Sequence, residues 1–307
     1  MADLLAIYQE LGLPGLVPHA LRDGSRGRQM LISKIKAGDP LFLIGTSLNA
    51  PFVLVKDDTY QAYVFASMVD AQAKCDELAA KRYNVHVEEF PGGEDREDAF
   101  LWLFDHGPTH VFINEAISIP ISRFASVPTY DGQPNEEHML RNRVLCGAIL
   151  HYLQTACAQM SNMEAENLWA RLMYHGTFLL AVRDDRANNY PILTDDIRGR
   201  PCALVYTDWR QIRMDFEEPP AGLLCRFEDM EEFLLANPGS GILLNRATCH
   251  ILLTVELFTI IKQLTISPAS DGPAARSALA SKPTVQTFGQ VGEDDWDKVD
   301  PTPDFLK

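Results

Sequence analysis

Short apolar runs of strand length alternate with helical periodicities over most of the chain. In the first half, turn residues such as Asn49-Ala50-Pro51 separate the apolar runs, and a helical pattern extends from Ser67 to Lys81. An acidic stretch at 94–98 favours a second helix start, because the helix dipole stabilises negative charge there. Strands are expected at 41–44, 52–56, 63–65, 85–87, 111–113 and 117–121.

The second half of the chain repeats this order. Pro-Phe-Val-Leu-Val-Lys-Asp-Asp at 51–58 is echoed by Tyr-Pro-Ile-Leu-Thr-Asp-Asp at 190–196, and the segment 109–114 is echoed by 240–245. Repetition on this scale predicts two copies of one packed unit. Helices are expected over 162–173, from 207 onward and over 228–235, with strands at 178–182, 191–194, 203–206, 222–225, 242–244 and 250–253.

These patterns predict an α+β fold: two homologous sheet-plus-helices domains in tandem, joined by a long helix. A wide apolar stripe at about 135–160 indicates that this central helix packs between the two domains. The expected segments are an N-terminal helix and loop (1–27), repeat 1 (28–125), a linker with the central helix (126–164), repeat 2 (165–265) and a disordered acidic tail (266–307).

Charge and composition narrow the functional classes. The formal net charge is −15 with no compensating Lys/Arg cluster, which argues against nucleic acid and against anionic membranes as partners. No apolar run reaches membrane-spanning length, and the first residues, 1–5, do not resemble a secretion signal. The six cysteines stand singly in apolar surroundings, as buried reduced thiols do, so a cytoplasmic location is expected.

Motifs for catalysis, metal and cofactors are missing from the sequence. No phosphate-cradling glycine loop and no Gly-x-Ser-x-Gly nucleophile turn occurs. His106 and His110 have helical spacing, but Gly107-Pro108 separates them, so they do not share a helix face. We therefore expect no catalytic residues, no metal and no cofactor.

Two acidic pairs, Asp57-Asp58 and Asp195-Asp196, are placed by the echo at equivalent hairpin positions. Aspartate is favoured in turns, so a turn role is expected. The alternative is a shared polar rim that recognises a ligand or a partner.

The string Tyr206-Thr207-Asp208-Trp209 predicts a helix cap at Thr207 or Asp208 directly after a strand. Trp209 then lies on the first helical turn, either as a lid over the core or as an exposed binding contact. In the tail, Phe288, Trp296 and Phe305 stand among acidic residues. They are candidates for docking on a partner, with packing on their own domain as the alternative.

The strand ending in Val205-Tyr206-Thr207-Asp208, the acidic helix 227–234 and the turn Asn237-Pro238-Gly239 together resemble the SseB N-terminal domain family. The resemblance covers about 165–262 well and about 28–125 weakly, since the first copy has Phe65-Ala66-Ser67 and His106-Gly107-Pro108 instead. It implies an α+β domain, often in tandem, of cytoplasmic bacterial proteins with no established enzymatic activity.

The leading functional hypothesis is a non-enzymatic cytoplasmic binding or adaptor protein with a protein partner. The second hypothesis is a sensor of an amino acid or a similar amine, with a pocket between the repeats edged by the four aspartates. A hydrolase is the third.

Overall fold

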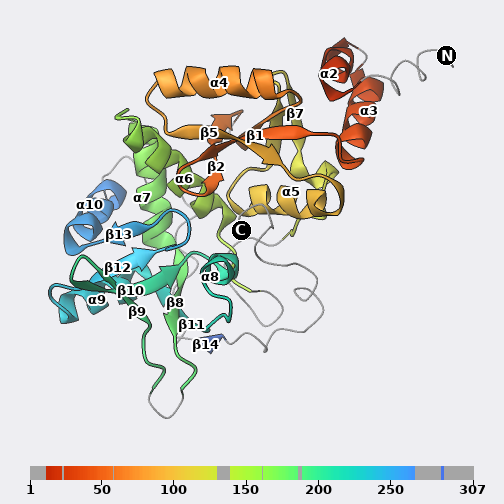
Figure 1. Cartoon of the computed structure of the whole chain (residues 1–307). Helices are drawn as coiled ribbons and strands as arrows, with labels where there is room; N and C mark the ends of the chain where they lie inside the picture. Colours follow the sequence, from red (N-terminus) through yellow and green to blue (C-terminus); the bar gives the residue numbers. More distant parts are fainter. Residues whose placement is uncertain are drawn as a thin grey trace. The chain divides into compact units, whose positions relative to one another are not determined.

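The computed structural model of the chain describes residues 12–22, 24–57, 59–129, 139–160, 162–185 and 189–266, and the backbone of 285–286 (Figure 1). The chain forms two compact units. Among the described residues, unit 1 comprises 12–129 and 153–160, and unit 2 comprises 139–152, 162–266 and 285–286. Each unit is one mixed sheet covered by helices, so the α+β fold of two sheet-plus-helix halves is confirmed.

Unit 1 begins with two helices that precede its sheet. Its helical elements are α2 (Leu13–Arg22), α3 (Gly24–Lys36), α4 (Met68–Ala80), η1 (Gly93–Asp95), α5 (Arg96–Asp105) and η2 (Ile121–Arg123). Its strands are β1 (Leu41–Thr46), β2 (Ala50–Pro51), β3 (Val53–Lys56), β4 (Thr59–Phe65), β5 (Val85–Phe90), β6 (His110–Ile113) and β7 (Ile117–Pro120).

The sheet of unit 1 has the order β5-β1-β4-β6-β7, with β2 beside β1 and β3 beside β4. Only the β4–β6 pair is parallel. Alternate residues of the strands face two apolar layers, as the period of two requires. Leu41, Leu43 and Val64 pack with α2, α3 and α5, whereas Ile44 and Phe65 pack under α4. Figure 1 shows α4 and α5 on opposite faces of this sheet.

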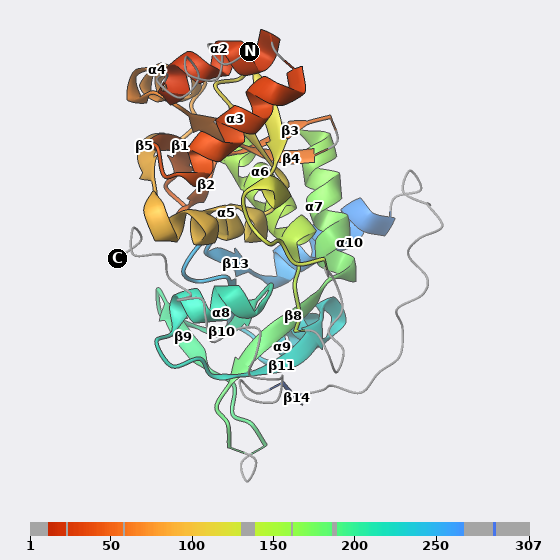
Figure 2. The same cartoon turned by 90° about the vertical axis from the view of Figure 1, so that its right-hand side faces the viewer.

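Unit 2 has the helices α7 (Met163–His175), α8 (Trp209–Asp215), α9 (Phe227–Ala236) and α10 (Val255–Ile266). Its strands are β8 (Thr177–Val182), β9 (Thr194–Ile197), β10 (Arg200–Tyr206), β11 (Ala221–Arg226), β12 (Gly241–Leu244), β13 (Ile251–Leu253) and β14 (Val285–Gln286). The sheet order is β13-β12-β10-β8-β11-β14, with β9 beside β10, and only β10–β12 is parallel. Figure 2 shows β14 beside β11.

The two sheets have the same connectivity and the same register. Replacing β1, β3, β4, β5, β6 and β7 by β8, β9, β10, β11, β12 and β13 converts one strand order into the other, with every pairing direction kept. In the parallel pairs, Ala62 faces Val111 and Ala203 faces Ile242. These registers define which residues of the two units are equivalent.

Helix α6 (Arg143–Cys157) contributes to both units, since residues up to 152 belong to unit 2 and those from 153 to unit 1. Its last part is fixed to unit 1 by Gln154, which is 5% exposed. The Gln154 side-chain amide donates to the Pro51 carbonyl, and its oxygen accepts from the Val53 N–H, both at 3.2 Å.

Three expectations about elements were wrong. Helix α2 forms where a loop was expected, because Pro14 occupies the first helical turn, where a missing N–H costs nothing. Strand β9 lies three residues later than 191–194. Helix α10, which no expected element covered, packs on α9, with the Phe227 and Phe258 rings 4.4 Å apart. Within the described ranges, every helix falls short of the length and apolarity that a bilayer crossing requires.

Candidate functional site

An asparagine in a left-handed conformation ends the second strand of the parallel pair in each unit. Asn114 has φ 47° and Asn245 has φ 49°. Each donates its N–H to the neighbouring parallel strand, at the carbonyl of Val64 or Val205, over 2.9 Å. Each side-chain oxygen also accepts the N–H of the residue that follows that strand, Ala66 or Thr207, at 2.9 Å. Asparagine tolerates this backbone region better than most residues, and the side chain ties the two strand ends together.

In unit 2 a buried polar cluster surrounds Asn245. Thr207 is fully buried and accepts from the Asn245 side-chain amide at 3.0 Å, while its hydroxyl donates to Asp208 at 2.9 Å. The Cys146 thiol lies 3.2 Å from the Thr207 hydroxyl and 3.4 Å from the Asp208 carboxylate. The other Asp208 oxygen caps α8 by accepting the Gln211 N–H at 3.1 Å. These side chains therefore satisfy one another.

Burial keeps three thiols of unit 2 protonated. Burial, with the negative charge of Asp208 as the next cause, raises the pKa of Cys146 well above its ordinary value. Burial also raises the pKa of Cys249 to about 12 and raises the pKa of Cys225. Because the thiolate is the nucleophilic form, these three groups are unsuited to attack a substrate at neutral pH.

Trp209 lies in the core of unit 2, with 1% of its surface exposed. It packs with Leu179 and Ile212 in the apolar layer under α8. Its ring lies 3.1 Å from the position that a Cβ on Gly222 would take, so a larger residue there would require the ring to shift.

A charge-reversed ion pair occupies equivalent positions in the two units. In unit 1, Lys74 of α4 contacts Glu115, the residue after Asn114, at 2.6 Å. In unit 2, Asp215 of α8 contacts Arg246, the residue after Asn245, at 2.9 Å. Lys74 and Asp215 are each the seventh residue of their helix, and each side chain is 8% exposed. The positions are the same, and the two charges are exchanged.

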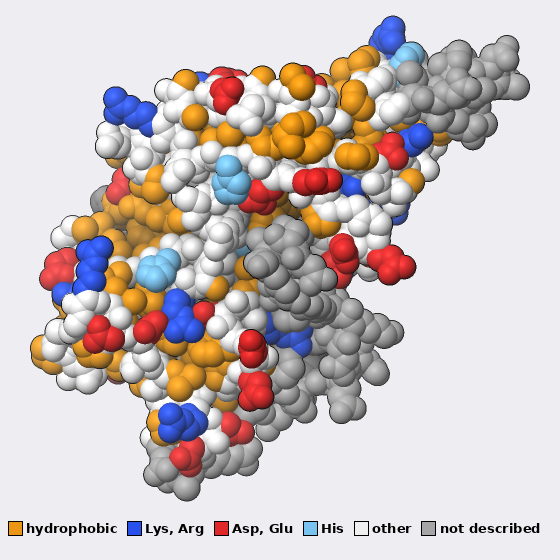
Figure 3. All heavy atoms as spheres, in the orientation of Figure 1, with side chains coloured by type: hydrophobic (Ala, Val, Ile, Leu, Met, Phe, Trp, Pro, Cys, Tyr) orange, Lys and Arg blue, Asp and Glu red, His pale blue; other side chains and the backbone are white. Residues whose placement is uncertain are grey.

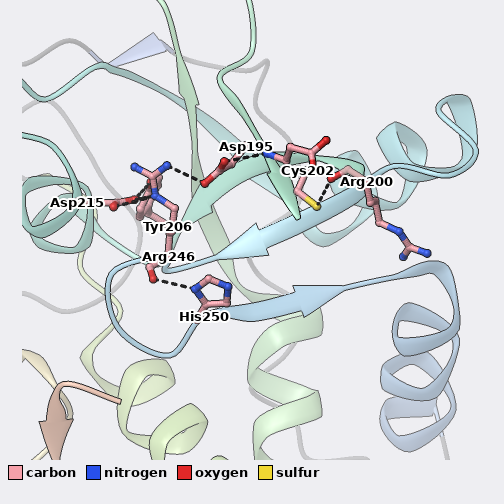
Figure 4. A network of polar contacts seen from close by, with 8 residues as sticks. Asp195, Arg200, Cys202, Tyr206, Asp215, Arg246 and His250 are labelled. Carbon is pink, nitrogen blue, oxygen red and sulfur yellow. Dashed lines mark hydrogen bonds and ion pairs between the residues drawn. The ribbon is translucent and has the colours of Figure 1, made fainter. Parts of the chain in front are cut away.

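The buried member of each pair has further polar partners. Burial by itself lowers the pKa of Lys74, but hydrogen bonds to Glu115 and Glu77 outweigh it, so the pKa ends above its ordinary value. Arg246 extends its pair to a network, since its Nη1 also donates to Asp195 at 3.0 Å (Figure 4). The Tyr206 hydroxyl donates to Asp215 in the same network. A paired and hydrogen-bonded charge is the form in which burial is tolerated.

Sequence analysis missed these four charged residues. A signal for them was present: Glu115 and Arg246 directly follow the two echoed asparagines, and Lys74 and Asp215 stand equally far from Phe65 and Tyr206. Only the spatial contact identifies them as pairs.

The acidic pairs do not occupy equivalent hairpin positions, contrary to the expectation. The last residue pair before the turn is Lys56 with Thr59 in unit 1 and Ile197 with Arg200 in unit 2. Asp57 therefore lies in its turn, with φ 50°, whereas Asp195 and Asp196 lie within β9. The equivalents of Asp57-Asp58 are Arg198-Gly199.

The individual aspartates have local partners in unit 2. Asp195 binds Arg246, and Asp196 accepts the Gly199 N–H at 2.7 Å across the turn. Asp58, Phe288, Trp296 and Phe305 lie outside the described residues. Among the described residues, no group of three or more His, Cys, Asp or Glu side chains is arranged to hold a metal ion.

No protein-family model matches the chain, and neither does any curated protein. Among solved structures, the chain is similar to Anabaena Tic22, a protein described as acting in protein transport. The sequence identity is 11%, the match covers 77% of this chain and 87% of that chain, and the TM-score is 0.18. A similarity at this level carries no argument about fold or function.

Proposed function

We propose that this protein is a non-enzymatic binding or adaptor protein, built from two copies of one domain and acting through protein partners. The observation that carries the proposal is the closed cluster of Thr207, Asp208, Asn245 and Cys146. In open parallel α/β sheets, ligands bind beyond the carboxyl ends of the parallel strands. The corresponding position in unit 2 is the carboxyl end of its parallel pair, β10–β12. Here that position is filled by buried side chains that bond to one another, and the neighbouring thiols are protonated.

The common origin of the two units is part of this proposal. It is supported by the identical strand order and register and by the paired asparagines with matching φ angles. Membership of the SseB N-terminal domain family is a further proposal. The Asp208 cap, helix α9 and the turn with Gly239 at φ 89° support it, because they fall on the residues that carry the resemblance.

Surface charge and thiol state are consistent with a soluble-protein partner in a reducing compartment such as the cytoplasm. Basic side chains are scattered over the face shown in Figure 3 and form no continuous basic patch there. All six cysteines are free, and five of them are buried. Free thiols are typical of reducing compartments.

The sensor hypothesis loses its main motivation, because the acidic pairs are not equivalent and Asp195 is already bound by Arg246. A thermal-shift screen with free amino acids and amines tests it directly, since a ligand that binds the native state raises the melting temperature. A saturable shift with any of these compounds would favour the sensor.

Affinity capture tests the adaptor proposal. The full chain and a chain ending at 266 are immobilised in parallel and exposed to an extract, and candidates are then purified and titrated by calorimetry. The proposal requires at least one purified protein that binds the full chain with defined stoichiometry. It fails if no recovered protein binds once purified, or if the chain turns over a substrate from a broad hydrolase panel.

A further inference from the structure

The two sheets differ at one edge. In unit 2, β11 pairs with β8 on one side and with the antiparallel segment β14 on the other. In unit 1, the equivalent strand β5 pairs with β1. No described residue pairs with its other edge. Backbone donors and acceptors therefore line one side of β5 in the described part of unit 1.

The hydrogen-bond pattern identifies which β5 residues face outward. The Phe52 N–H donates to the Ile44 carbonyl at 2.8 Å, on the edge of β1 opposite β5. Alternate residues of a strand face opposite edges, so Gly45 and Leu43 face β5. Their partners His86 and Glu88 consequently face β1. The outward residues are Val85, Val87 and Glu89.

The same reasoning in unit 2 leads to the matching position. The Leu193 N–H donates to the Ala181 carbonyl at 2.9 Å, so Leu180 faces β11 and its partner Leu223 faces β8. Gly222 then faces outward, and it is the residue paired with Gln286 of β14. By register, Val87 is the equivalent of Gly222.

The sequence of β5 favours pairing. The strand keeps an unbroken register with β1 over six residues and contains no proline, lysine or bulge, the usual devices that protect an edge. Val85 and Val87 are half-buried, and Glu89 is exposed on the same face of the strand. A bound strand would place a basic residue opposite Glu89 and β-branched residues opposite the two valines.

We propose that the free edge of β5 binds an extended, basic segment of a partner protein as an added antiparallel strand. The segment has the pattern basic-x-β-branched-x-β-branched, centred on Val87. This inference rests on the proposed binding function and names its surface and partner class. A second copy of the chain is disfavoured as the occupant, because each copy carries a net charge of −15 and two copies therefore repel each other.

The test uses two fluorescent peptides, Thr-Lys-Thr-Val-Thr-Val-Thr and its counterpart with glutamate in place of lysine, titrated against the full chain by anisotropy. The basic peptide is expected to bind saturably and the acidic one roughly five- to tenfold more weakly. Hydrogen exchange with the basic peptide bound should show new protection at 85–90 and none at 221–226.

Two variants and a matched control make the test specific. Val87→Pro removes an outward N–H and should weaken binding about tenfold or more. Leu224→Pro makes the same change at an outward residue of the equivalent strand β11 and should leave binding unchanged. Glu89→Arg keeps the backbone intact and should reverse the preference between the two peptides. This variant tests the inference even if Val87→Pro does not fold.

Several results would overturn the inference. They are equal binding of both peptides, binding unaffected by Val87→Pro in a folded protein, a preference unchanged by Glu89→Arg, or protection at β11 in place of β5. If the purified partner of the capture experiment still binds in any of these cases, only the assignment to β5 fails. If no partner exists, the proposed function fails as well.

Discussion

The charge-reversed ion pair leads to the most demanding prediction. If Lys74–Glu115 and Asp215–Arg246 are two versions of one interaction, unit 1 should accept the polarity of unit 2. The single variants Glu115→Arg and Lys74→Asp each place like charges at a contact of 2.6 Å. The double variant restores an attractive pair with the polarity of unit 2.

The structure sets the size of the effect. At 2.6 Å the direct attraction is about 6 kcal/mol for an effective dielectric constant of about 20. Desolvation cancels most of it, and Glu115 is 41% exposed, which screens the pair further. We expect each single variant to lower the free energy of unfolding by about 1–2 kcal/mol, with a coupling energy of about 2 kcal/mol in the double variant.

Urea unfolding of the four proteins at neutral pH measures the cycle. Hydrogen exchange locates the loss, which should fall on 59–80 and 110–116 of unit 1, with unit 2 as the internal control. Additive single effects, with no coupling in the double variant, would refute the reasoning that the two pairs are interchangeable. A loss of protection spread equally over both units would do the same.

Three further predictions follow from the same contacts. Asn245→Ala should lower the free energy of unfolding in urea by about 2–3 kcal/mol, because it adds strain at positive φ and leaves the Thr207 N–H without its acceptor. Asn245→Gly should lower it by about 1 kcal/mol less, because glycine adopts positive φ without strain. Equal losses for the two variants would contradict the strain contribution. In the native protein at neutral pH, iodoacetamide should label the exposed thiol of Cys157 within minutes and leave the five buried thiols unlabelled, as measured by peptide mass spectrometry. Fast labelling of Cys146 would contradict its burial. Hydrogen bonds from Lys74 and then Lys81 lower the pKa of Glu77 from 4.5 to about 2, so the stability that the Glu77 carboxylate contributes is present above pH 4.5 and is lost as pH falls toward 2. Glu77→Gln should therefore weaken the dependence of the melting temperature on pH over that range. A shift of the melting temperature by the same amount at all pH values would argue against the linkage.

Much of the architecture followed from the sequence, because strand and helix periodicities are local properties. The order of apolar and polar residues predicts most strands of both units, the helix after Tyr206 and the echo that ends at Asn114 and Asn245, but it misplaces β9 and does not predict β14. Elements with weak local signals were the ones missed. Helix α2 begins with Gly12-Leu13-Pro14-Gly15, which resembles a turn, and α10 follows the last strand without a clear start signal.

The candidate site could not be predicted in the same way, because its members are joined across long stretches of chain. Lys74 and Glu115 are charged residues in separate elements, and nothing in their local sequence shows that they touch. The acidic pairs illustrate the opposite error. The similar sequences of 51–58 and 190–196 predict equivalent positions for the aspartates, but the strand registers show that they are displaced.

The sequence by itself determined that this chain folds as two α+β units and carries a strongly negative net charge, since periodicity and composition need no knowledge of contacts. The tertiary structure decided which residues are equivalent, that the polar groups around Thr207 satisfy one another, and which side of β5 lacks a strand among the described residues. Those properties depend on register and burial, which arise only when strands distant in sequence pair and exclude water.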